Sequence, residues 1–452
     1  MSVTSELCNR IEAIGYGDLS EAAVKAARQL VLDGLAVAIA GPEEEAVNIL
    51  AEHYKEQGGT PQAHAIAFGF KTNMVSAAML NGASMHVLDF EPMWSPANHQ
   101  LSTTLPAVLA VAEHTGADGR AVATALVKGI EMQGWLRQAS GQYMAGQIRF
   151  HPPGAVGTFG SAVAAGHILG LDAGKLANAI GMAASRAGSL LANAGTMTKS
   201  THCGHATGLG LECALLAARG FTANTEIFEA GQSYANAFCG DAFKPEELLN
   251  YGPPFRVVTP GYAIKMFPSQ FGTHFAITAG LDLRPKLPSA AAIKRITMIS
   301  PVMNYVDRPV PATGLSGKFS LQYTLAAALL DGKVRIHTFT DERLAAPDMQ
   351  ALLAKIELIK DPSIPARFEE MHIDVKVELE DGTIVETRCN GPRGKWGTPP
   401  ISVDEHMVKV RDCLATRLDD KAAAELIGLA SNIDGIDAAG VRRLMEIASC
   451  KA

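Results

Sequence analysis

Apolar residues recur every three or four positions through most of the first half of the chain. Between residues 20 and 49, for example, Val24, Ala27 and Val31 fall on one face of a helix. The same pattern returns in Ala-rich stretches bounded by Gly, Pro or Thr, at residues 105–113, 121–135, 156–169 and 208–219. We therefore predict that roughly the first 250 residues form a run of helices with almost no strand.

The pattern changes beyond the Pro/Gly-rich stretch at residues 251–254. Residues 293–300 have the composition of a strand, and residues 373–379 alternate apolar with charged side chains. Asp381-Gly382 separates that strand from residues 384–387, and an Asp-Gly pair between two strands predicts a hairpin.

Helical periodicity resumes after a second Gly/Pro-rich stretch, at residues 391–400, and continues to the end of the chain. The simplest architecture is a mainly α fold in which both chain ends build a large helical domain and a smaller α+β lid domain is inserted between them. We place the helical domain at residues 1–255 and 398–452, and the lid domain at 256–397. Because ligand sites are common where domains meet, we expect the chemistry there.

Composition excludes several classes of function. The 452 residues are 48% hydrophobic and 19% charged, with 43 glycines, which suits a large core of closely packed helices. The net charge of −7 and the absence of a Lys/Arg run argue against nucleic-acid binding. The polar N-terminus predicts no secretory signal, and no stretch supplies the ~18 apolar residues of a membrane span. We therefore expect neither nucleic acid nor membrane as a partner.

The cysteines favour neither disulfides nor a metal site. They are seven in number and scattered, and no two form a C-x-x-C pair. This pattern predicts free thiols in a reducing compartment, and hence a cytoplasmic protein. Zinc would need a further pair of ligands beside His202, Cys203 and His205, and none stands at a recognisable spacing. We expect no metal.

Motifs for nucleotide binding or serine hydrolysis are also missing. Gly208-Leu209-Gly210 lacks a third glycine and a preceding strand, and the sequence contains neither a P-loop nor a Gly-x-Ser-x-Gly motif. We therefore expect no cofactor. The chemistry that remains for side chains alone is mostly proton transfer.

Three predicted helix starts carry residues suited to an anion. Asp89 and His99 precede the first, His151 precedes the second, and Lys199 and His202 precede the third. A helix N-terminus offers free N–H groups, and a neighbouring cation strengthens its attraction for an anion. Together the three would bind a di- or tricarboxylate. Taken singly, each has a structural explanation: the histidines and Asp89 fit as caps of turns, and Lys199 fits as a surface lysine.

Three further candidates lie in the second region. Lys265 and His274 flank the start of one apolar helix, and Tyr323 opens another. Here too a structural explanation exists. Lys265 fits a surface charge, and Tyr323 fits a half-buried phenol of the core.

The segments around these candidates follow one another in a distinctive order and spacing. The most specific is Gly195-Thr196-Met197-Thr198-Lys199, followed by His202 and by Gly204-His205-Ala206. The others lie at residues 18–38, 81–90, 151–154 with 169–172, 265–274 and 319–323. Together they resemble the MmgE/PrpD family over nearly the whole chain. That family includes 2-methylcitrate dehydratase, cis-aconitate decarboxylase and an iminodisuccinate epimerase.

The resemblance implies a large helical domain, a smaller α+β lid domain and a homodimer. It also implies an active site between the domains that uses neither metal nor organic cofactor. Carried over onto matching positions, that site would be lined by Asp89, His99, His151, Lys199, His274 and Tyr323, with His202 and Lys265 as neighbours.

The resemblance also implies roles for these residues. Lys199 would stabilise the charge that develops when a C–H beside a carboxylate loses its proton. His99 would move that proton, and Asp89 would orient His99 or tune its basicity. His151 and His274 would bind substrate carboxylates or protonate a leaving hydroxyl. Tyr323 would serve as a second acid.

Two stretches depart from the family pattern. Glu91-Pro92 replaces an acidic pair, and Gln270-Phe271 occupies a stretch that often bears Cys and Arg. The loss of an arginine predicts a substrate with a different acid group, or with fewer of them. The expected activity is that of a carbon–oxygen lyase that dehydrates a small hydroxylated acid similar to 2-methylcitrate. Epimerisation or decarboxylation of a related acid is the first alternative, and a non-catalytic carboxylate-binding protein on the same fold is the second.

Overall fold

The computed structural model describes residues 2–143 and 147–450. The chain forms two compact units: unit 1 comprises Met1–Ala263 and Val403–Ala452, and unit 2 comprises Ile264–Ser402. The structure is 57% helical with one mixed sheet of four strands, which confirms the predicted mainly α fold with a small α+β part. The domain boundaries expected from the sequence, after residues 255 and 397, fall slightly earlier in the chain than the limits of these units.

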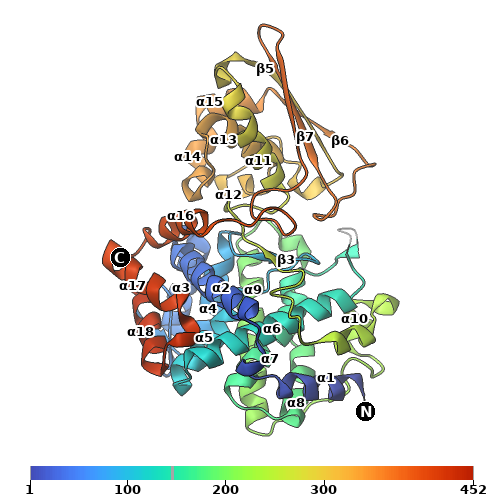
Figure 1. The fold of residues 1–452 in the computed structure, drawn as a ribbon, viewed down its shortest axis with the longest axis vertical. Coiled ribbons are helices and arrows are strands. Elements are labelled where there is room, and N and C mark those ends of the chain that lie inside the picture. Colours follow the sequence, from blue (N-terminus) through green and yellow to red (C-terminus); the bar gives the residue numbers. More distant parts are fainter. Residues whose placement is uncertain (1, 144–146, 451–452) are drawn as a thin grey trace. The chain divides into compact units, whose positions relative to one another are not determined.

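Unit 1 is built almost entirely from helices (Figure 1). They are α1 (Val3–Ala13), α2 (Glu21–Ala40), α3 (Glu45–Gln57), α4 (Met74–Val87), α5 (Leu105–Thr115), α6 (Gly119–Ala139), α7 (Pro152–Ile168), α8 (Ala173–Ala184), α9 (Thr198–Ala218), α10 (Tyr234–Phe238), α16 (Val403–Leu414), α17 (Asp420–Ser431) and α18 (Ala438–Ala448). Unit 1 also contains two short antiparallel strand pairs. They are β1 (Ala63–His64) with β2 (Lys71–Thr72), and β3 (Met93–Trp94) with β4 (Tyr262–Ala263). No helix in the described part of the chain is long and apolar enough to cross a membrane.

Two helix boundaries differ from the prediction. The stretch at residues 20–49 forms two helices, because Gly41-Pro42 interrupts it after α2. The helix predicted at residues 208–219 begins ten residues earlier, at Thr198, so that Lys199 and His202 lie within its first turns. Gly204, Gly208 and Gly210 are contact positions of this continuous helix.

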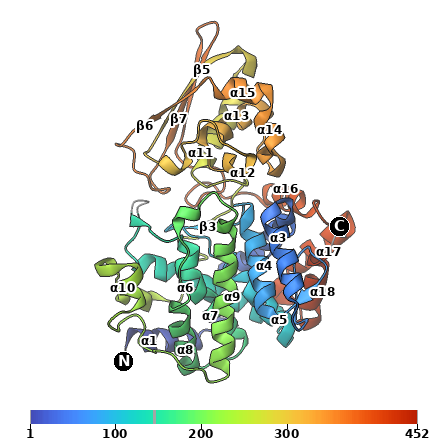
Figure 2. The ribbon, with the colours of Figure 1, turned by 180° about the vertical axis from the view of Figure 1, so that it is seen from behind.

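Those glycines let α9 approach two neighbouring helices closely. A Cβ atom at Gly204 would overlap the main-chain oxygen of Met79 in α4, and one at Gly210 would overlap that of Thr158 in α7. Figure 2 shows α6, α7 and α9 side by side. The close packing brings the end of α4 and the start of α9 together, and both carry candidate residues.

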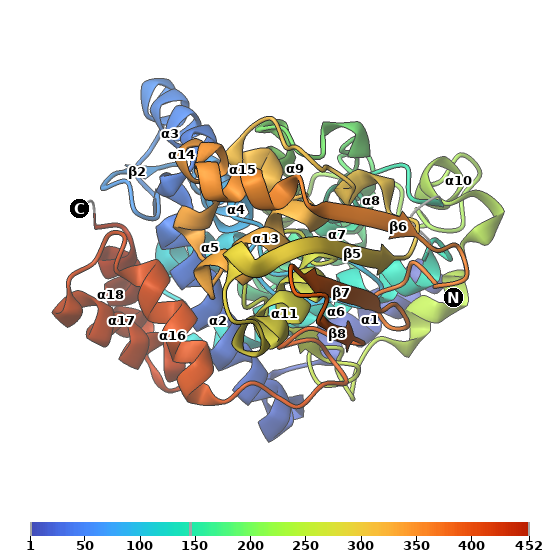
Figure 3. The ribbon, with the colours of Figure 1, turned by 90° about the horizontal axis from the view of Figure 1, so that it is seen from above.

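Unit 2 contains the sheet and a layer of helices. Strands β5 (Ile293–Ser300), β6 (Ile356–Lys360), β7 (Ile373–Leu379) and β8 (Ile384–Cys389) lie in the order β6-β5-β7-β8 (Figure 3). β5 pairs with β6 in parallel, and the other pairs are antiparallel. The helices on one face of the sheet (Figure 1) are α11 (Thr273–Leu283), α12 (Gly314–Gly317), α13 (Leu321–Asp331), α14 (Asp341–Ala345) and α15 (Pro347–Leu353).

The alternation predicted for the hairpin is present. Val375 and Val377 of β7 are buried in the core of unit 2, and Lys376 between them is exposed. Gly382 turns the chain with φ +84°, a value that suits glycine. Edge strand β6 was missed, because its exposed Glu357 and Lys360 weaken the apolar pattern of so short a strand.

Close helix packing predicts that Gly204→Ala destabilises the protein. The added methyl group meets main-chain atoms of α4, so we expect the free energy of unfolding to fall by about 1–3 kcal/mol. Gly428→Ala is the matched control, since this exposed helical glycine of α17 has no atom within 4 Å of an added Cβ. It should raise stability by about 0.5–1 kcal/mol. Equal melting temperatures for the two variants would contradict the packing argument.

Candidate active site

The turn after α4 holds Asp89 in an unusual backbone conformation. Its φ is +51°, in the left-handed region, and its N–H donates to the carbonyl of His86 at 2.8 Å. Aspartate tolerates this region better than most residues, yet the conformation has a cost that its surroundings must offset. The carboxylate of Asp89 is buried.

Lys199, near the start of α9, contacts this turn directly. Its Nζ donates to Asp89 Oδ2 at 2.8 Å and lies 3.0 Å from His86 Nε2. The side chain is only 12% exposed, so the alternative of a solvated surface lysine is wrong. Because an ammonium group can only donate, His86 Nε2 accepts, and the proton of its neutral ring is therefore on Nδ1.

Glu91 lies two residues beyond Asp89 and is fully buried. Its Oε1 is 2.5 Å from His86 Nδ1, accepts from Ser102 Oγ at 3.0 Å and lies 3.1 Å from His99 Nδ1. Burial alone would raise the pKa of Glu91, but His86 and His99 outweigh it and hold that pKa well below its usual value. Glu91 is therefore a buried carboxylate that gathers two histidines.

His99 is positioned by Glu91 more than by Asp89. Its Nδ1 is within hydrogen-bond distance of Glu91, whereas its Nε2 is 3.8 Å from Asp89 Oδ1. A proton on Nδ1, directed at Glu91, leaves the Nε2 lone pair for proton transfer. The resemblance implied that Asp89 orients His99 or tunes its basicity, whereas the shorter contact of His99 is with Glu91.

His151 and His202 complete the cluster. His151 is the residue before the first turn of α7, where Pro152 begins the helix, and its Nδ1 is 3.1 Å from that of His202 in α9. The ring centres of His86 and His99 are 4.7 Å apart, and His151 lies 5.6 and 6.2 Å from them. The three helix starts predicted to converge therefore do bring their residues together.

Burial and Lys199 keep the rings of His86, His151 and His202 neutral by lowering their pKa values. Burial first, and the positive charge of Lys199 second, lower the pKa values of His86 and His202 to about 4. The same two causes hold the pKa of His151 well below its usual value. Neutral imidazoles can both donate and accept, so the cluster offers hydrogen bonds and proton transfer near neutral pH.

Two members of the cluster were missed as candidates. His86 was noted only as part of the segment at residues 81–90, and Glu91 only as a departure from the family pattern. Glu91 was within reach of sequence reasoning, since a carboxylate eight residues before His99 is a ready partner for its imidazole ring. His86 gave no separate signal, because a histidine inside an apolar helix is common in protein cores.

The other candidates lie in unit 2. Lys265 and His274 are buried, and Lys265 Nζ and His274 Nε2 each lie 3.2 Å from the carbonyl oxygen of Ser269. Lys265 is therefore not a surface charge. Tyr323 is buried in the core of unit 2, its hydroxyl donates to the carbonyl of Thr338, and burial raises its pKa. These contacts match the structural explanation given for Tyr323.

The cluster in unit 1 also contains groups able to hold a metal ion. One group consists of Asp89, Glu91 and His99. The other consists of His86, Glu91 and Cys203. Lys199 already brings a positive charge to Asp89, and Glu91 already accepts hydrogen bonds from neighbouring side chains. The expectation of a site without a metal ion stays a prediction. All seven cysteines lie in the described residues and are free thiols.

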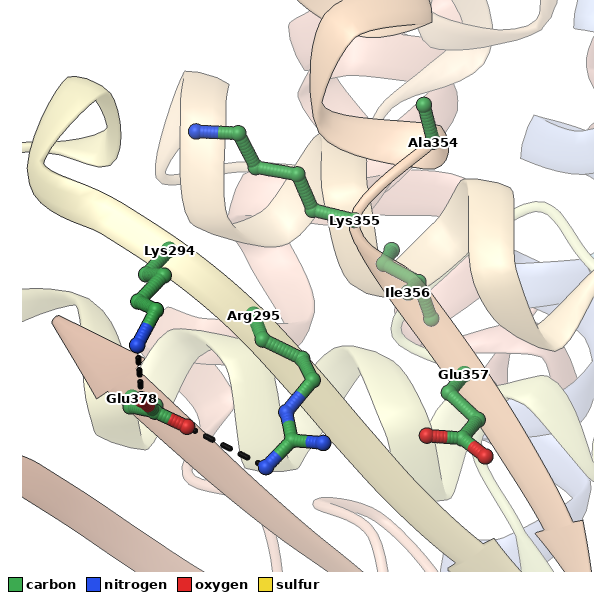
Figure 4. A pocket seen from close by; sticks show the side chains of 7 residues that line it. All are labelled: Lys294, Arg295, Ala354, Lys355, Ile356, Glu357 and Glu378. Atoms are coloured by element: carbon green, nitrogen blue, oxygen red, sulfur yellow. Dashed lines mark hydrogen bonds and ion pairs between the residues drawn. The ribbon is translucent and has the colours of Figure 1, made fainter. Parts of the chain in front are cut away.

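A separate open groove lies on the sheet of unit 2 (Figure 4). Glu378 pairs there with Lys294 at 2.6 Å and with Arg295 at 3.1 Å, and both cations are more than half exposed. Exposed ion pairs of this kind contribute little energy. None of the residues that line the groove is a candidate from the sequence.

Two family models match successive parts of the chain. A model of the MmgE/PrpD N-terminal domain matches residues 5–246, and one of the MmgE/PrpD C-terminal domain matches residues 267–434. The chain belongs to the MmgE/PrpD family. The resemblance noted in the sequence is thereby confirmed.

Several curated members of this family are similar to the chain over most of their length. Cis-aconitate decarboxylase of Mus musculus is 29% identical, over 96% of this chain and 91% of its own. The decarboxylase of Homo sapiens is also 29% identical, over 96% and 92%. The 2-methylcitrate dehydratase of Cupriavidus necator is 26% identical, over 81% and 80%. The relatives are thus enzymes with two different reactions.

The low histidine pKa values can be tested by NMR titration. We expect the His86 and His202 rings to stay neutral until the pH approaches 4. Lys199→Met should raise both pKa values, since it removes the nearby positive charge. Lys25→Met, which removes an exposed lysine of α2, should leave them unchanged. A wild-type His86 that titrates near 6.5 would contradict the assigned environment.

Proposed function

We propose that this protein is a lyase that uses acid–base chemistry on a small di- or tricarboxylic acid. The observation that carries the proposal is the buried Glu91 carboxylate, which holds His86 and His99 beside the Lys199–Asp89 ion pair. Such an arrangement places a proton-transfer group next to a fixed positive charge. Both are needed when charge develops on a substrate carboxylate.

Lys199 and His99 share the chemistry in this proposal. When a carbon beside a carboxylate loses a proton or carbon dioxide, the electron pair spreads onto that carboxylate. The ammonium of Lys199 stabilises this charge, and neutral His151 adds a hydrogen bond. His99 then takes a proton from carbon or returns one to it through Nε2.

Decarboxylation of cis-aconitate is the first candidate reaction. The two mammalian decarboxylases match 96% of this chain, more than the 81% matched by the Cupriavidus dehydratase. Carbon dioxide leaves from the methylene arm, and the C–C bond electrons form a new terminal double bond. The old double bond shifts its electron pair to its CH carbon, which bears one of the two remaining carboxylates, and His99 protonates that carbon. The products are methylenesuccinate and carbon dioxide.

Dehydration of a 2-methylcitrate-like acid is the second candidate, and the one expected from the sequence. His99 would take a proton from the carbon beside a carboxylate, and His151 would protonate the departing hydroxyl. The distant dehydratase relatives support it. The same cluster serves both reactions, because both place charge beside a carboxylate.

Proton NMR of the purified protein with a panel of acids tests the proposal. The panel contains cis-aconitate, 2-methylcitrate, citrate, malate and iminodisuccinate. Methylenesuccinate signals from cis-aconitate would establish decarboxylase activity. New vinyl signals from 2-methylcitrate would establish dehydratase activity. If iminodisuccinate is converted to its epimer and no new double bond forms, the protein is an isomerase rather than a lyase. Binding of an acid without any turnover would favour the non-catalytic alternative and contradict the proposal.

Removing the proton-transfer group or its support should lower kcat. We expect a loss of about a hundredfold or more for His99→Gln and of at least about tenfold for Glu91→Gln. Glu113→Gln is the matched control, since Glu113 is another buried carboxylate of unit 1, 2.7 Å from His64 Nδ1, outside the cluster. Its kcat should match wild type. Equal kcat values for wild type and His99→Gln, both folded, would remove the central assignment.

Metal removal provides a separate test. Because Lys199 supplies the positive charge, dialysis against a chelator should leave kcat within about twofold of the untreated enzyme. Metal analysis of the dialysed sample serves as the control. A loss of activity that a divalent ion restores would instead assign a metal to Asp89, Glu91 and His99.

A further inference from the structure

A second buried ion cluster involves α16, the first helix of unit 1 after unit 2. Lys409 Nζ is 3.0 Å from Asp33 Oδ1 and 2.8 Å from Oδ2, and it donates to the carbonyl oxygen of Phe90 at 2.8 Å. His406, one turn earlier in α16, places its Nε2 2.8 Å from Asp33 Oδ2. The side chains of Asp33 and Lys409 are at most 1% exposed.

The ammonium group of Lys409 makes two hydrogen bonds in this arrangement. It donates to Asp33 Oδ1 and to the Phe90 carbonyl, and Asp33 Oδ2 lies 2.8 Å away in the same ion pair. The Nζ also lies 4.3 Å from the centre of the Phe90 ring, which adds a cation–π contact. A charge buried this deeply is held in one place, because any movement would leave it unpaired.

Phe90 lies between the two acidic residues of the candidate site. Asp89 precedes it with a left-handed φ of +51°, and Glu91 follows it. A strained turn of this kind persists only when its surroundings fix it. The Phe90 carbonyl belongs to the peptide that joins Phe90 to Glu91, so a bond to this oxygen fixes the orientation of that peptide.

We propose that Lys409 is a positioning residue for the candidate site. Anchored by Asp33, it holds the Phe90 carbonyl and thereby keeps Asp89 beside Lys199 and Glu91 beside His99. The expected fall in kcat rests on the proposed function, whereas the expected loosening of the backbone around Phe90 does not. Lys409 of α16 thereby takes part in a site whose other residues come from the first segment of unit 1, Met1–Ala263.

Lys409→Met removes the contact with Phe90, and His406→Gln is its matched control. Both variants take one partner from Asp33, but only Lys409 touches the turn. Two readouts separate positioning from simple destabilisation. One is hydrogen–deuterium exchange across residues 86–94, measured in a temperature range where both variants are folded. The other is the split between kcat and KM on the acid that the wild-type enzyme turns over.

We expect Lys409→Met to accelerate exchange across residues 86–94 by about tenfold or more. Its kcat should fall by about tenfold to a hundredfold with a smaller change in KM, because misplaced catalytic groups lose rate more than binding. His406→Gln should melt at a lower temperature but keep wild-type exchange in this turn and a kcat close to wild type.

The experiment still decides the inference if one variant does not fold or one measurement cannot be made. If Lys409→Met does not fold, Lys409→Gln keeps a donor for Asp33 but is one atom too short to reach Phe90 as well, and the same results are expected. If the wild-type protein turns over no acid, the proposed function fails and the exchange data alone decide the positioning role. Wild-type exchange in the Lys409 variants, or an equal change in His406→Gln, would overturn the inference.

Discussion

The candidate site depends on the burial of one negative charge. Glu91 is completely removed from solvent, and a carboxylate in that position must be surrounded by donors or lose its charge. His86, His99 and Ser102 supply contacts to the same oxygen of Glu91. His86 in turn presents its other nitrogen to Lys199, which pairs with Asp89. One oxygen of Glu91, Oε1, therefore gathers both histidines and, through His86, connects them to the lysine, whereas Oε2 has no hydrogen-bond partner among the described residues.

The packing of unit 1 brings these groups together. The cluster joins the end of α4, the start of α7 and the first turns of α9, and the glycines of α9 allow the close approach. Lys409 fixes the connecting turn from the opposite end of the sequence. A site assembled from distant segments in this way needs a rigid frame, which the tightly packed helices of unit 1 provide.

Much of this architecture could be predicted from the sequence, because helical periodicity and the Asp381-Gly382 hairpin are local signals. His99, His151 and Lys199 were also found, since polar residues at helix starts stand out in an apolar chain. The contacts of Lys199 could not be predicted, because it lies more than a hundred positions from His86 and Asp89. Glu91 lies only five and eight positions from His86 and His99, but its sequence position does not show that both rings contact its buried carboxylate, which the packing decides.

In the proposed chemistry, His99 delivers or removes a proton at a carbon beside a substrate carboxylate. Turnover of the active acid in heavy water, followed by NMR of the product, tests this role of His99. For the decarboxylase we expect a single deuterium, at the former alkene CH carbon, which becomes the CH2 group of methylenesuccinate that bears a carboxylate. For the dehydratase we expect deuterium exchange at the carbon beside the carboxylate in recovered substrate. In both cases deuterium should enter on one face only. Product or substrate labelled equally on both faces, or labelled at an unchanged rate in a folded His99→Gln variant, would contradict this role of His99.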